Sequence, residues 1–351
     1  RKESSAASDV YKRQIMKIII PMAGRGSRLR PHTLTTPKPL IPIAGKPIVH
    51  RLAEDIHRLS SEAIDEIAFV IGDFGEEVEK NLLQIAQSLG AKGSIYRQEE
   101  PLGTAHAIWM AKEAMDGPVV VAFADTLFQA NFELDTTNDG VVWVKQVENP
   151  SAFGVVKLDN NGFITDFIEK PKEFVSDLAI IGIYFFKDGQ ELKNEIRYLI
   201  DNNIMKSGEY QLTDALENMR AKGKKFTLGK VDEWMDCGNK TVTVETNSKV
   251  LGFCGEFEIP SSAKITNSLI IQPCFIGENV IIEDSKVGPN VSLGNGTKVI
   301  GTNIENSLVQ ENAVIENAHL TESMIGNNAE YYGLSRSISL GDYSVIDFKL
   351  Q

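Results

Sequence analysis

Residues 17–31, KIIIPMAGRGSRLRP, begin with an apolar, β-branched run and continue into a basic segment that is rich in glycine. A continuous run of this kind is typical of a strand that is buried on both faces of a parallel sheet. Gly24 and Gly26 then allow positive φ angles and close backbone approach, so that amide groups can face phosphate oxygens. The stretch therefore predicts a first strand followed by a phosphate-binding loop, although a tight turn without a ligand would use the same glycines.

Strand-like runs and helical patterns alternate downstream, up to about residue 130. Apolar residues recur at helical spacing over residues 49–59, for example, whereas residues 67–71 form a continuous apolar run. This order predicts repeated βαβ units and a parallel sheet covered by helices on both faces. Residues 139–186 are rich in strand patterns and residues 189–221 in helical ones, which indicates a substrate-covering extension of the same α/β domain.

A different texture begins at about residue 257, where helical periodicity disappears and short aliphatic motifs recur. Examples are IGENVI at residue 276, VGPNVS at 287 and IGNNAE at 325. One aliphatic residue in every step of about six is typical of a solenoid in which three short strands per coil point that residue inward. Residues 257–351 therefore predict a parallel β-helix, with irregular coils because several steps depart from six residues.

Bulk composition sets limits on the partners. The content of 42 % hydrophobic and 24 % charged residues is that of a globular protein, and the net charge of −12 disfavours nucleic acid and anionic membranes as partners. No apolar run approaches the roughly 20 residues of a membrane span. Three widely spaced cysteines fit neither a disulfide framework nor a zinc knuckle, which favours a cytoplasmic location. Residues 1–15 are polar and aperiodic, and we expect them to be a non-native or disordered leader.

Charge is distributed unevenly in a way that points to an anion site. No acidic residue occurs between Lys17 and Ala53, while basic residues there interleave with glycine and proline. A solvated basic face would not require that interleaving, so we expect the segment to bind an anion. A dinucleotide fingerprint is excluded because Leu29 stands where its third glycine belongs, and the lysine-bearing P-loop pattern is also absent.

The segment GRGSRLRP followed by TPKPLIPIAGKPI resembles the signature of the sugar-1-phosphate nucleotidylyltransferase family, which includes glucose-1-phosphate thymidylyltransferases. The resemblance continues in order through QEEPLGTAHA, VVVAFAD, FGVV, FIEKP, GEYQLTDAL and WMDCG, and covers roughly residues 17–250. It implies a Rossmann-like nucleotidyltransferase domain with a mixed sheet over residues 16–256. The hexapeptide repeats of residues 257–351 resemble the left-handed parallel β-helix of the long-form members.

The resemblance also implies which residues hold the triphosphate. The backbone of Ala23, Gly24 and Gly26 would surround the phosphates. Arg28 and Lys38 would neutralise their charge and act in catalysis.

Two further positions match the family's nucleobase site. Gln98 would meet the base through an amide that can both donate and accept hydrogen bonds, and Gly103 would allow close backbone approach.

Asp125 and Asp236 match the two aspartates with which the family holds magnesium. Asp125 ends the apolar run VVVAFAD, at the edge where open α/β sheets place their ligands, and Asp236 lies in WMDCG. Two adjacent carboxylates repel unless a cation intervenes, and Mg²⁺ prefers one or two carboxylates together with phosphate oxygens. The cofactor implied is Mg²⁺.

The sugar-phosphate site is implied by FIEKP and its surroundings. Lys170 would bind the phosphate and contribute to catalysis, and Glu169 would accept hydrogen bonds from sugar hydroxyls. Gly154 and Gly182 would lie beside the sugar.

The expected reaction is an in-line displacement in which a sugar 1-phosphate oxygen attacks the α-phosphorus of a nucleoside triphosphate and pyrophosphate leaves. No general base is needed, so catalysis rests on positioning and charge neutralisation. The best match is dTTP with glucose 1-phosphate; guanylyl transfer to mannose 1-phosphate and uridylyl transfer from UTP are alternatives. Ala23, Ser27 and Ala124 depart from the usual pattern of the thymidylyl enzymes, and leave the base and sugar open.

Two other classes of function stay in view. Similar β-helices occur in acyltransferases, for which His319 is the candidate base. A catalytically silent nucleotide-sensing or assembly subunit would keep the fold, but the intact charged residues argue against it. The β-helix favours a homo-oligomer, because solenoid faces bury against partners. We interpret His32, His50, His57 and His106 as structural, because they lack triad or metal-ligand spacing.

Overall fold

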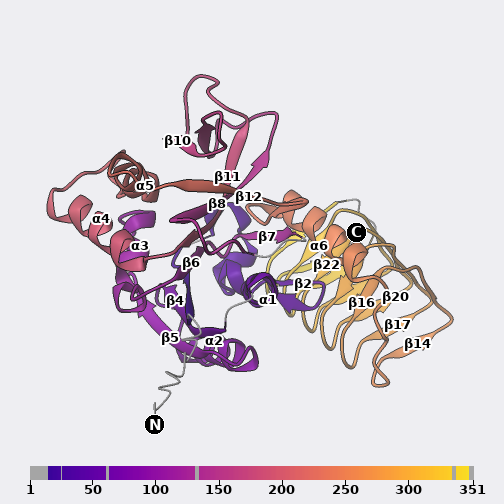
Figure 1. The fold of residues 1–351 in the computed structure, drawn as a ribbon. Helices are drawn as coiled ribbons and strands as arrows, with labels where there is room; N and C mark the ends of the chain where they lie inside the picture. The colour runs from indigo at the N-terminus through magenta and orange to yellow at the C-terminus, as the bar shows by residue number, and fades with distance from the viewer. Residues whose placement is uncertain (1–14, 25, 61–62, 131–133, 334–336, 348–351) are drawn as a thin grey trace, which may run out of the picture. The chain divides into compact units, whose positions relative to one another are not determined.

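The computed structural model describes residues 15–24, 26–60, 63–130, 134–333 and 337–347, which form two compact units (Figure 1). The first unit contains the described residues of segments 1–21, 56–122 and 131–230, and the second those of segments 22–55, 123–130 and 231–351. All but the last residue of the predicted leader lie outside the described residues. The domain boundaries predicted at residues 15 and 257 stay predictions.

A nine-stranded mixed sheet forms the framework of the first unit. Its main path runs β10-β9-β11-β6-β1-β4-β5, and β8 joins it by pairing with β11 on one side and β12 on the other. The strands are β1 (Met16–Pro21), β4 (Ile64–Ile71), β5 (Lys92–Arg97), β6 (Val119–Ala122), β8 (Gly140–Gln146), β9 (Gly154–Leu158), β10 (Ile164–Glu169), β11 (Leu178–Phe186) and β12 (Phe226–Lys230).

The first strand lies inside this sheet, as its composition predicts. β1 pairs in parallel with β4 and with β6, so that Ile18 faces Ile67 on one side and Val120 on the other. Ile18, Ile19 and Ile20 are fully buried. The parallel part β6-β1-β4-β5 confirms the βαβ prediction, and the antiparallel pairing of β11 with β6 makes the whole sheet mixed.

Helices pack against this sheet at several places. α2 contacts β5 and β4, and α3 contacts β1 and β4. Asp188 is the N-cap of α4. Its side chain accepts a hydrogen bond from the amide of Gln190 and so satisfies one of the free amides of the first turn. The helices of this unit are α2 (Glu76–Ser88), α3 (Thr104–Met110), the 3₁₀ turn η4 (Lys112–Ala114), α4 (Gly189–Asp201) and α5 (Leu212–Ala221). α1 (Ile48–Leu59) starts in the second unit and ends in the first.

The second unit combines the glycine-rich segment, two short antiparallel pairs, the start of α1, the helix α6 and the β-helix. Its first elements are the 3₁₀ turns η1 (Ser27–Leu29), η2 (His32–Leu34) and η3 (Lys38–Leu40), then β2 (Pro42–Ile43), β3 (Lys46–Pro47), β7 (Thr126–Gln129), β13 (Glu233–Asp236) and α6 (Lys240–Cys254). β2 pairs with β3, and β7 pairs with β13, both antiparallel.

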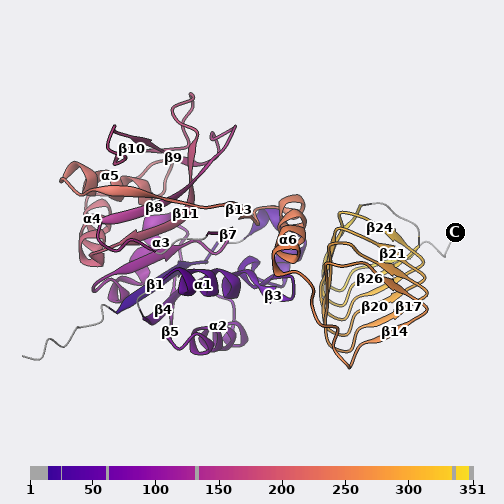
Figure 2. The same ribbon diagram turned by 45° about the vertical axis from the view of Figure 1, so that its right-hand side comes forward.

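Three parallel sheets make up the β-helix, and successive coils stack along one direction, as the strands from β14 to β26 show in Figure 2. Its strands are β14 (Lys264–Thr266), β15 (Leu269–Ile270), β16 (Cys274–Ile276), β17 (Ile281–Glu283), β18 (Lys286–Val287), β19 (Val291–Leu293), β20 (Lys298–Ile300), β21 (Asn303–Ile304), β22 (Ser307–Val309), β23 (Val314–Glu316), β24 (His319–Leu320), β25 (Met324–Ile325), β26 (Glu330–Tyr332), β27 (Ser339–Leu340) and β28 (Val345–Asp347).

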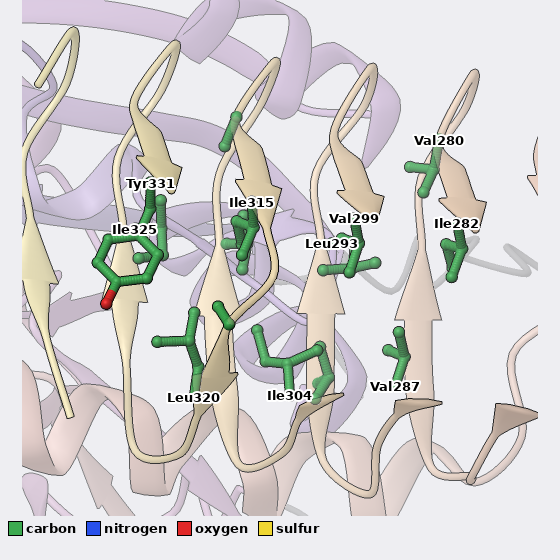
Figure 3. Packing of buried hydrophobic residues seen from close by; sticks show 14 of the residues in the cluster. Val280, Ile282, Val287, Leu293, Val299, Ile304, Ile315, Leu320, Ile325 and Tyr331 are labelled. Carbon is green, nitrogen blue, oxygen red and sulfur yellow. The ribbon is translucent and has the colours of Figure 1, made fainter. Parts of the chain in front are cut away.

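The coils are irregular, as predicted, and they shorten toward the end. Along the first sheet, paired residues are Lys264, Ile281, Lys298, Val314, Glu330 and Val345, which gives steps of 17, 17, 16, 16 and 15 residues. The aliphatic residues of the repeats point inward and form one core (Figure 3). Asparagine or aspartate occupies many corners between strands in the left-handed conformation that these residues tolerate, namely Asn267, Asn279, Asp284, Asn290, Asn306, Asn312, Asn317 and Asn328.

α6 connects the β-helix to the rest of its unit through a buried amide. Asn247 is fully buried, and its Oδ1 accepts hydrogen bonds from the amide of Ala44 at 2.9 Å and from the hydroxyl of Ser292 at 2.7 Å. Gly45, at φ 79°, lies so close to Phe275 that a Cβ would be 2.2 Å from its ring. The β2–β3 turn is therefore fixed against both α6 and the second unit's β-helix.

The β-helix core predicts a clear contrast between buried and exposed isoleucines. Ile315 is fully buried in the core, whereas Ile265 in the first coil is 37 % exposed. Ile315→Ala should lower the free energy of unfolding by about 2–5 kcal/mol, because it leaves a cavity. Ile265→Ala is the matched control and should cost about 1 kcal/mol or less. Urea unfolding followed by circular dichroism measures both, and equal losses would contradict the core assignment.

Candidate functional site

The glycine-rich segment forms a tight loop after β1, and Gly26 is the residue that its geometry requires. Gly26 has φ 58° and starts η1, with its carbonyl accepting from the amide of Leu29 at 3.0 Å. A Cβ here would lie 3.0 Å from Cβ of Lys38 and 3.1 Å from Cγ2 of Thr33. At Gly24, by contrast, a Cβ would meet no atom within 4 Å. The close approach predicted for both glycines is thus present at Gly26, and Gly24 borders open space.

The neighbours of these glycines divide between core and surface. Leu29, which replaces the third glycine of a dinucleotide fingerprint, is 1 % exposed and belongs to the core. Arg28 is exposed and Ala23 is half-buried, while Arg25 lies outside the described residues. Arg28 is exposed next to the buried Leu29, so its guanidinium is available to a ligand.

Lys38 is a buried cation. Its residue is 7 % exposed, and its Nζ lies 3.1 Å from Oδ2 of Asp125. A buried ammonium is stable only with a compensating anion. Asp125 supplies that charge, and it remains 45 % exposed itself, so the ion pair lies at the edge of an accessible surface.

Pairing of β7 with β13 brings the two predicted metal ligands together. Asp125 immediately precedes β7, and Asp236 ends β13 opposite Thr126. The amide of Cys237 donates to the carbonyl of Asp125 at 3.1 Å, which closes this end of the pair. Two carboxylates that are more than 100 residues apart in the chain therefore share one end of a short antiparallel pair.

Electrostatics at this pair is unbalanced. Burial raises the pKa of Asp236 above its ordinary value, the negative charge of Asp125 raises it further, and the cations of Lys38 and Arg28 offset only part of the rise. The buried thiol of Cys237 has its pKa raised to about 12, mainly by desolvation, so it stays neutral. The arrangement favours a further cation beside the two carboxylates.

That cation would have to be bound partly by another molecule. Within the ranges that the structure describes, no group of three or more histidine, cysteine, aspartate or glutamate side chains could hold a metal. Two carboxylates alone fit Mg²⁺, which takes its remaining ligands from water and phosphate oxygens. The donor set therefore fits a magnesium ion that is held together with a phosphate ligand.

In the first unit, Gln98 and Gly103 are brought together by the turn that precedes α3. Nε2 of Gln98 donates to the carbonyl of Gly103 at 3.3 Å. Gly103 has φ 106°, and a Cβ would lie 2.5 Å from the carbonyl oxygen of Tyr210. The carbonyl of Tyr210 also accepts a hydrogen bond from the amide of Ala105 at 3.0 Å. A side chain at position 103 would therefore separate this turn from the segment before α5.

His106 fixes the orientation of the Gln98 amide, which is a structural role next to a proposed binding residue. Nε2 of Gln98 lies 3.0 Å from Nδ1 of His106. The carbonyl of Gly103 can only accept, so the amide must present its NH₂ group to this side, and Nδ1 must then accept as well. Burial lowers the pKa of His106, with the charge of Glu100 opposing, which favours the neutral ring that can accept. Oε1 of Gln98 is left as an acceptor on the opposite side.

The sugar-phosphate candidates meet on β9 and β10 of the first unit. Gly154 pairs with Glu169, and a Cβ on Gly154 would lie 3.1 Å from Oε2 of Glu169. Thr213 donates to the same oxygen at 3.4 Å, and Nζ of Lys170 lies 3.7 Å from the other carboxylate oxygen. Lys170 is 63 % exposed at its side chain. Glycine at 154 thus leaves one edge of the Glu169 carboxylate accessible.

Two details of this group were not predicted from the sequence. Thr213 is a partner of Glu169 from α5, and its only sequence signal was its place in the motif GEYQLTDAL. Gly182 has φ 85° within β11, between Ile180 and Tyr184, where the pairing with β8 changes register. This glycine therefore allows a bulge in a central strand.

The other predicted features are placed as follows. His319 lies exposed on β24, with Nδ1 3.3 Å from Nδ2 of Asn303. Cys237, Cys254 and Cys274 are all free thiols. Across the described part of the chain, no helix has both the length and the apolar character that a membrane crossing requires.

Comparison with known proteins identifies relatives over most of the chain. Residues 17–252 match the family model described as nucleotidyl transferase. A glucose-1-phosphate thymidylyltransferase of Streptomyces antibioticus is 28 % identical over 95 % of this chain and all of its own length. The low-salt glycan biosynthesis nucleotidyltransferase Agl11 of Haloferax volcanii is 30 % identical over 90 % of this chain and 93 % of its own.

In two further comparisons the alignment covers only part of one of the two proteins. The bifunctional protein GlmU of Methanococcus maripaludis is 32 % identical over 78 % of this chain and 61 % of its own length. A crystal structure of UDP-glucose pyrophosphorylase complexed with UDP-glucose aligns with a TM-score of 0.55 and 25 % identity, over 68 % of this chain and all of the other.

The unbalanced carboxylates predict that Asp236 costs stability at neutral pH in metal-free solution. A carboxyl whose folded pKa is raised stabilises the fold below the unfolded pKa, and that stabilisation is lost as pH rises through the folded pKa. Asp236→Asn should therefore raise Tm at pH 7 in chelator, and the gain should vanish below about pH 4. Thermal unfolding across pH measures this.

The exposed Asp65, to which no partner is assigned, provides the matched control as Asp65→Asn, which should leave Tm unchanged at every pH. A lower Tm for Asp236→Asn at pH 7 would contradict the electrostatic account.

Proposed function

This chain belongs to the nucleotidyl transferase family and transfers a nucleotidyl group to a sugar 1-phosphate, and we propose that its substrates are dTTP and glucose 1-phosphate. The relative from Streptomyces antibioticus supports this pair, because it is named for it and aligns over its full length. The observation that carries the mechanism is the unbalanced Asp125–Asp236 pair beside the buried Lys38.

Sugar nucleotidyltransferases of this family generally use a divalent metal. We propose that Asp125 and Asp236 hold Mg²⁺, which would supply positive charge next to the phosphates of the nucleotide. A metal bound here would offset the burial and the charge of Asp125 that together raise the pKa of Asp236. Lys38 already forms an ion pair with Asp125, so it is held where it can also neutralise a phosphate oxygen.

The remaining residues divide the two substrates between them. The loop at Ala23, Gly24 and Gly26 exposes backbone to the triphosphate, and the exposed Arg28 adds a cation to it. The exposed Lys170 binds the sugar phosphate, and Glu169, oriented by Thr213, accepts from sugar hydroxyls.

The reaction needs no proton transfer. An anionic oxygen of the sugar 1-phosphate forms a bond to the α-phosphorus, while the bond from that phosphorus to the β-phosphate oxygen breaks and takes its electron pair to pyrophosphate. Positive side chains stabilise the charge that spreads over the transferring group, and positioning supplies the rest of the rate enhancement.

The fixed amide of Gln98 narrows the choice of base. Its Oε1 can accept a hydrogen bond from the ring N–H of thymine, uracil or guanine, whereas the corresponding ring nitrogens of cytosine and adenine are acceptors and would be repelled. This supports dTTP, UTP and GTP over CTP and ATP. We infer dTTP among the three from the full-length relatives.

Location and assembly complete the proposal. Three free thiols favour a reducing compartment, and we propose that the enzyme works in the cytoplasm. The outward faces of the β-helix suit a homo-oligomer.

Pyrophosphate release across a matrix of five nucleoside triphosphates and several sugar 1-phosphates tests the reaction. We expect the largest kcat/KM with dTTP and glucose 1-phosphate in Mg²⁺. Asp125→Asn and Asp236→Asn should each lower kcat by roughly 10²-fold, because each removes a proposed ligand of the Mg²⁺ that would compensate the charge of the transferring group. Asp65→Asn should retain full activity. Unchanged rates in the first two variants would remove the metal assignment, and silence across the matrix would favour the sensing or assembly subunit.

Base discrimination gives an independent prediction. His106→Leu removes the acceptor that holds the amide of Gln98, so KM for dTTP should rise about fivefold, the equivalent of one hydrogen bond of about 1 kcal/mol. The preference for dTTP over CTP should fall by a similar factor. KM for glucose 1-phosphate should stay the same. His57→Leu, at an exposed position of α1, serves as the control; equal effects of the two substitutions would argue against the role of His106.

A further inference from the structure

The last coil of the β-helix contacts the segment that follows the glycine-rich loop. Nε2 of His32 lies 3.1 Å from the hydroxyl of Ser339, and the hydroxyl of Thr35 donates to Oδ2 of Asp342. Gly341 faces Pro31, where a Cβ would lie 2.8 Å from that ring. Residues about 300 positions apart in the chain thus meet at three neighbouring points within the second unit.

This contacted segment supports the loop directly. The hydroxyl of Thr33 donates to the carbonyl of Gly26 at 2.8 Å, and its methyl group is one of the atoms that approach Gly26 most closely. Thr33 belongs to η2, whose first residue is the His32 that meets the last coil. A displacement of η2 would therefore change the conformation of Gly26, from which η1 and Arg28 continue.

On the β-helix side of the contact, hydrogen bonds within the β-helix hold Asp342 in place. Oδ1 of Asp342 accepts from the amide of Asn327 at 2.7 Å. Nδ2 of Asn327 donates in turn to Oε1 of the buried Gln310 at 2.7 Å, in the coil before. Asp342 is therefore the end of a hydrogen-bonded ladder across stacked coils, and its second oxygen is directed to Thr35.

His32 makes the contact insensitive to pH in the neutral range. It is fully buried, and burial lowers its pKa to about 4, with Asp342 opposing and Lys240 assisting. Nδ1 of His32 is buried without a hydrogen-bond partner among the described residues. Such an unsatisfied group costs free energy.

We propose that the last coil of the β-helix belongs to the nucleotide-binding apparatus, with Ser339 and Asp342 as positioning residues that hold the triphosphate loop through His32 and Thr35. The inference rests on the proposed role of that loop. Binding is reciprocal, so a triphosphate bound to the loop should also stabilise the last coil. The β-helix then acts on catalysis from within its own chain, without carrying a catalytic residue.

Inorganic tripolyphosphate with Mg²⁺ is the probe, because it needs no assumption about the base. Calorimetry should show that Asp342→Ala and Thr35→Val each weaken its binding about fivefold. The double variant should be no weaker than the singles, because both substitutions remove one interaction. Asp284→Ala is the matched control, since Asp284 is also a turn aspartate that accepts from a neighbouring coil, through Asn267, and should leave binding unchanged.

Two readouts separate this proposal from the proposed function. In hydrogen exchange without any ligand, Asp342→Ala should speed exchange at residues 26–38, and Asp284→Ala should not. In the enzyme assay, Asp342→Ala should raise KM for the nucleotide and leave KM for the sugar phosphate unchanged. Normal loop exchange and normal tripolyphosphate binding in folded Asp342→Ala would overturn the positioning role. Failure of wild type to release pyrophosphate from any substrate pair would instead overturn the function and leave the loop measurements to decide this proposal.

Discussion

Asp125 and Asp236 meet at one end of the β7–β13 pair, where burial of Asp236 and the nearby charge of Asp125 both oppose the ionisation of Asp236. The chain brings both carboxylates to one end of the β7–β13 pair, buries Lys38 against one of them, and still leaves the pKa of the other raised. The charged form of Asp236 therefore lowers stability at neutral pH, and a cation beside it would offset that cost. The loop at Gly26, the buried Lys38 and the β7–β13 pair lie in the same compact unit, so the groups proposed to bind the triphosphate share one support.

Glycine and asparagine positions show how the backbone serves this arrangement. Gly26 and Gly103 combine a positive φ with a neighbour closer than a Cβ allows, so each substitution there would be both strained and obstructed. Asn290 and Asn306, by contrast, occupy left-handed corners with side chains that bond to one another at 2.9 Å across coils. Positive φ angles thus allow close backbone contacts at the glycines of the loops and regular stacking of coils at the asparagines of the β-helix.

Much of this was accessible from the sequence, because the relevant signals are local. The β-branched run of β1, the aliphatic steps of the repeats and the ordered family motifs predicted the mixed sheet, the β-helix and the reaction. What escaped prediction are side-chain contacts that leave no pattern in the sequence. Thr213 and His32 meet partners 44 and 307 positions away, and His106 lies only eight positions from Gln98 but at a spacing that does not indicate their contact. Histidines without ligand spacing were interpreted as structural, although two of them lie beside proposed binding groups.

Departures from ordinary folding rules cluster where binding is proposed. Lys38 is a buried cation, Lys170 has φ 42° without being glycine, and His32 buries an unpaired nitrogen. Each lowers stability, and each lies at or next to a group that would meet a phosphate. In the β-helix the core is continuous, and most left-handed corners carry asparagine, which tolerates that conformation. Asp342 in the last coil is held by hydrogen bonds within the β-helix, so it can hold the loop segment that it contacts in one conformation.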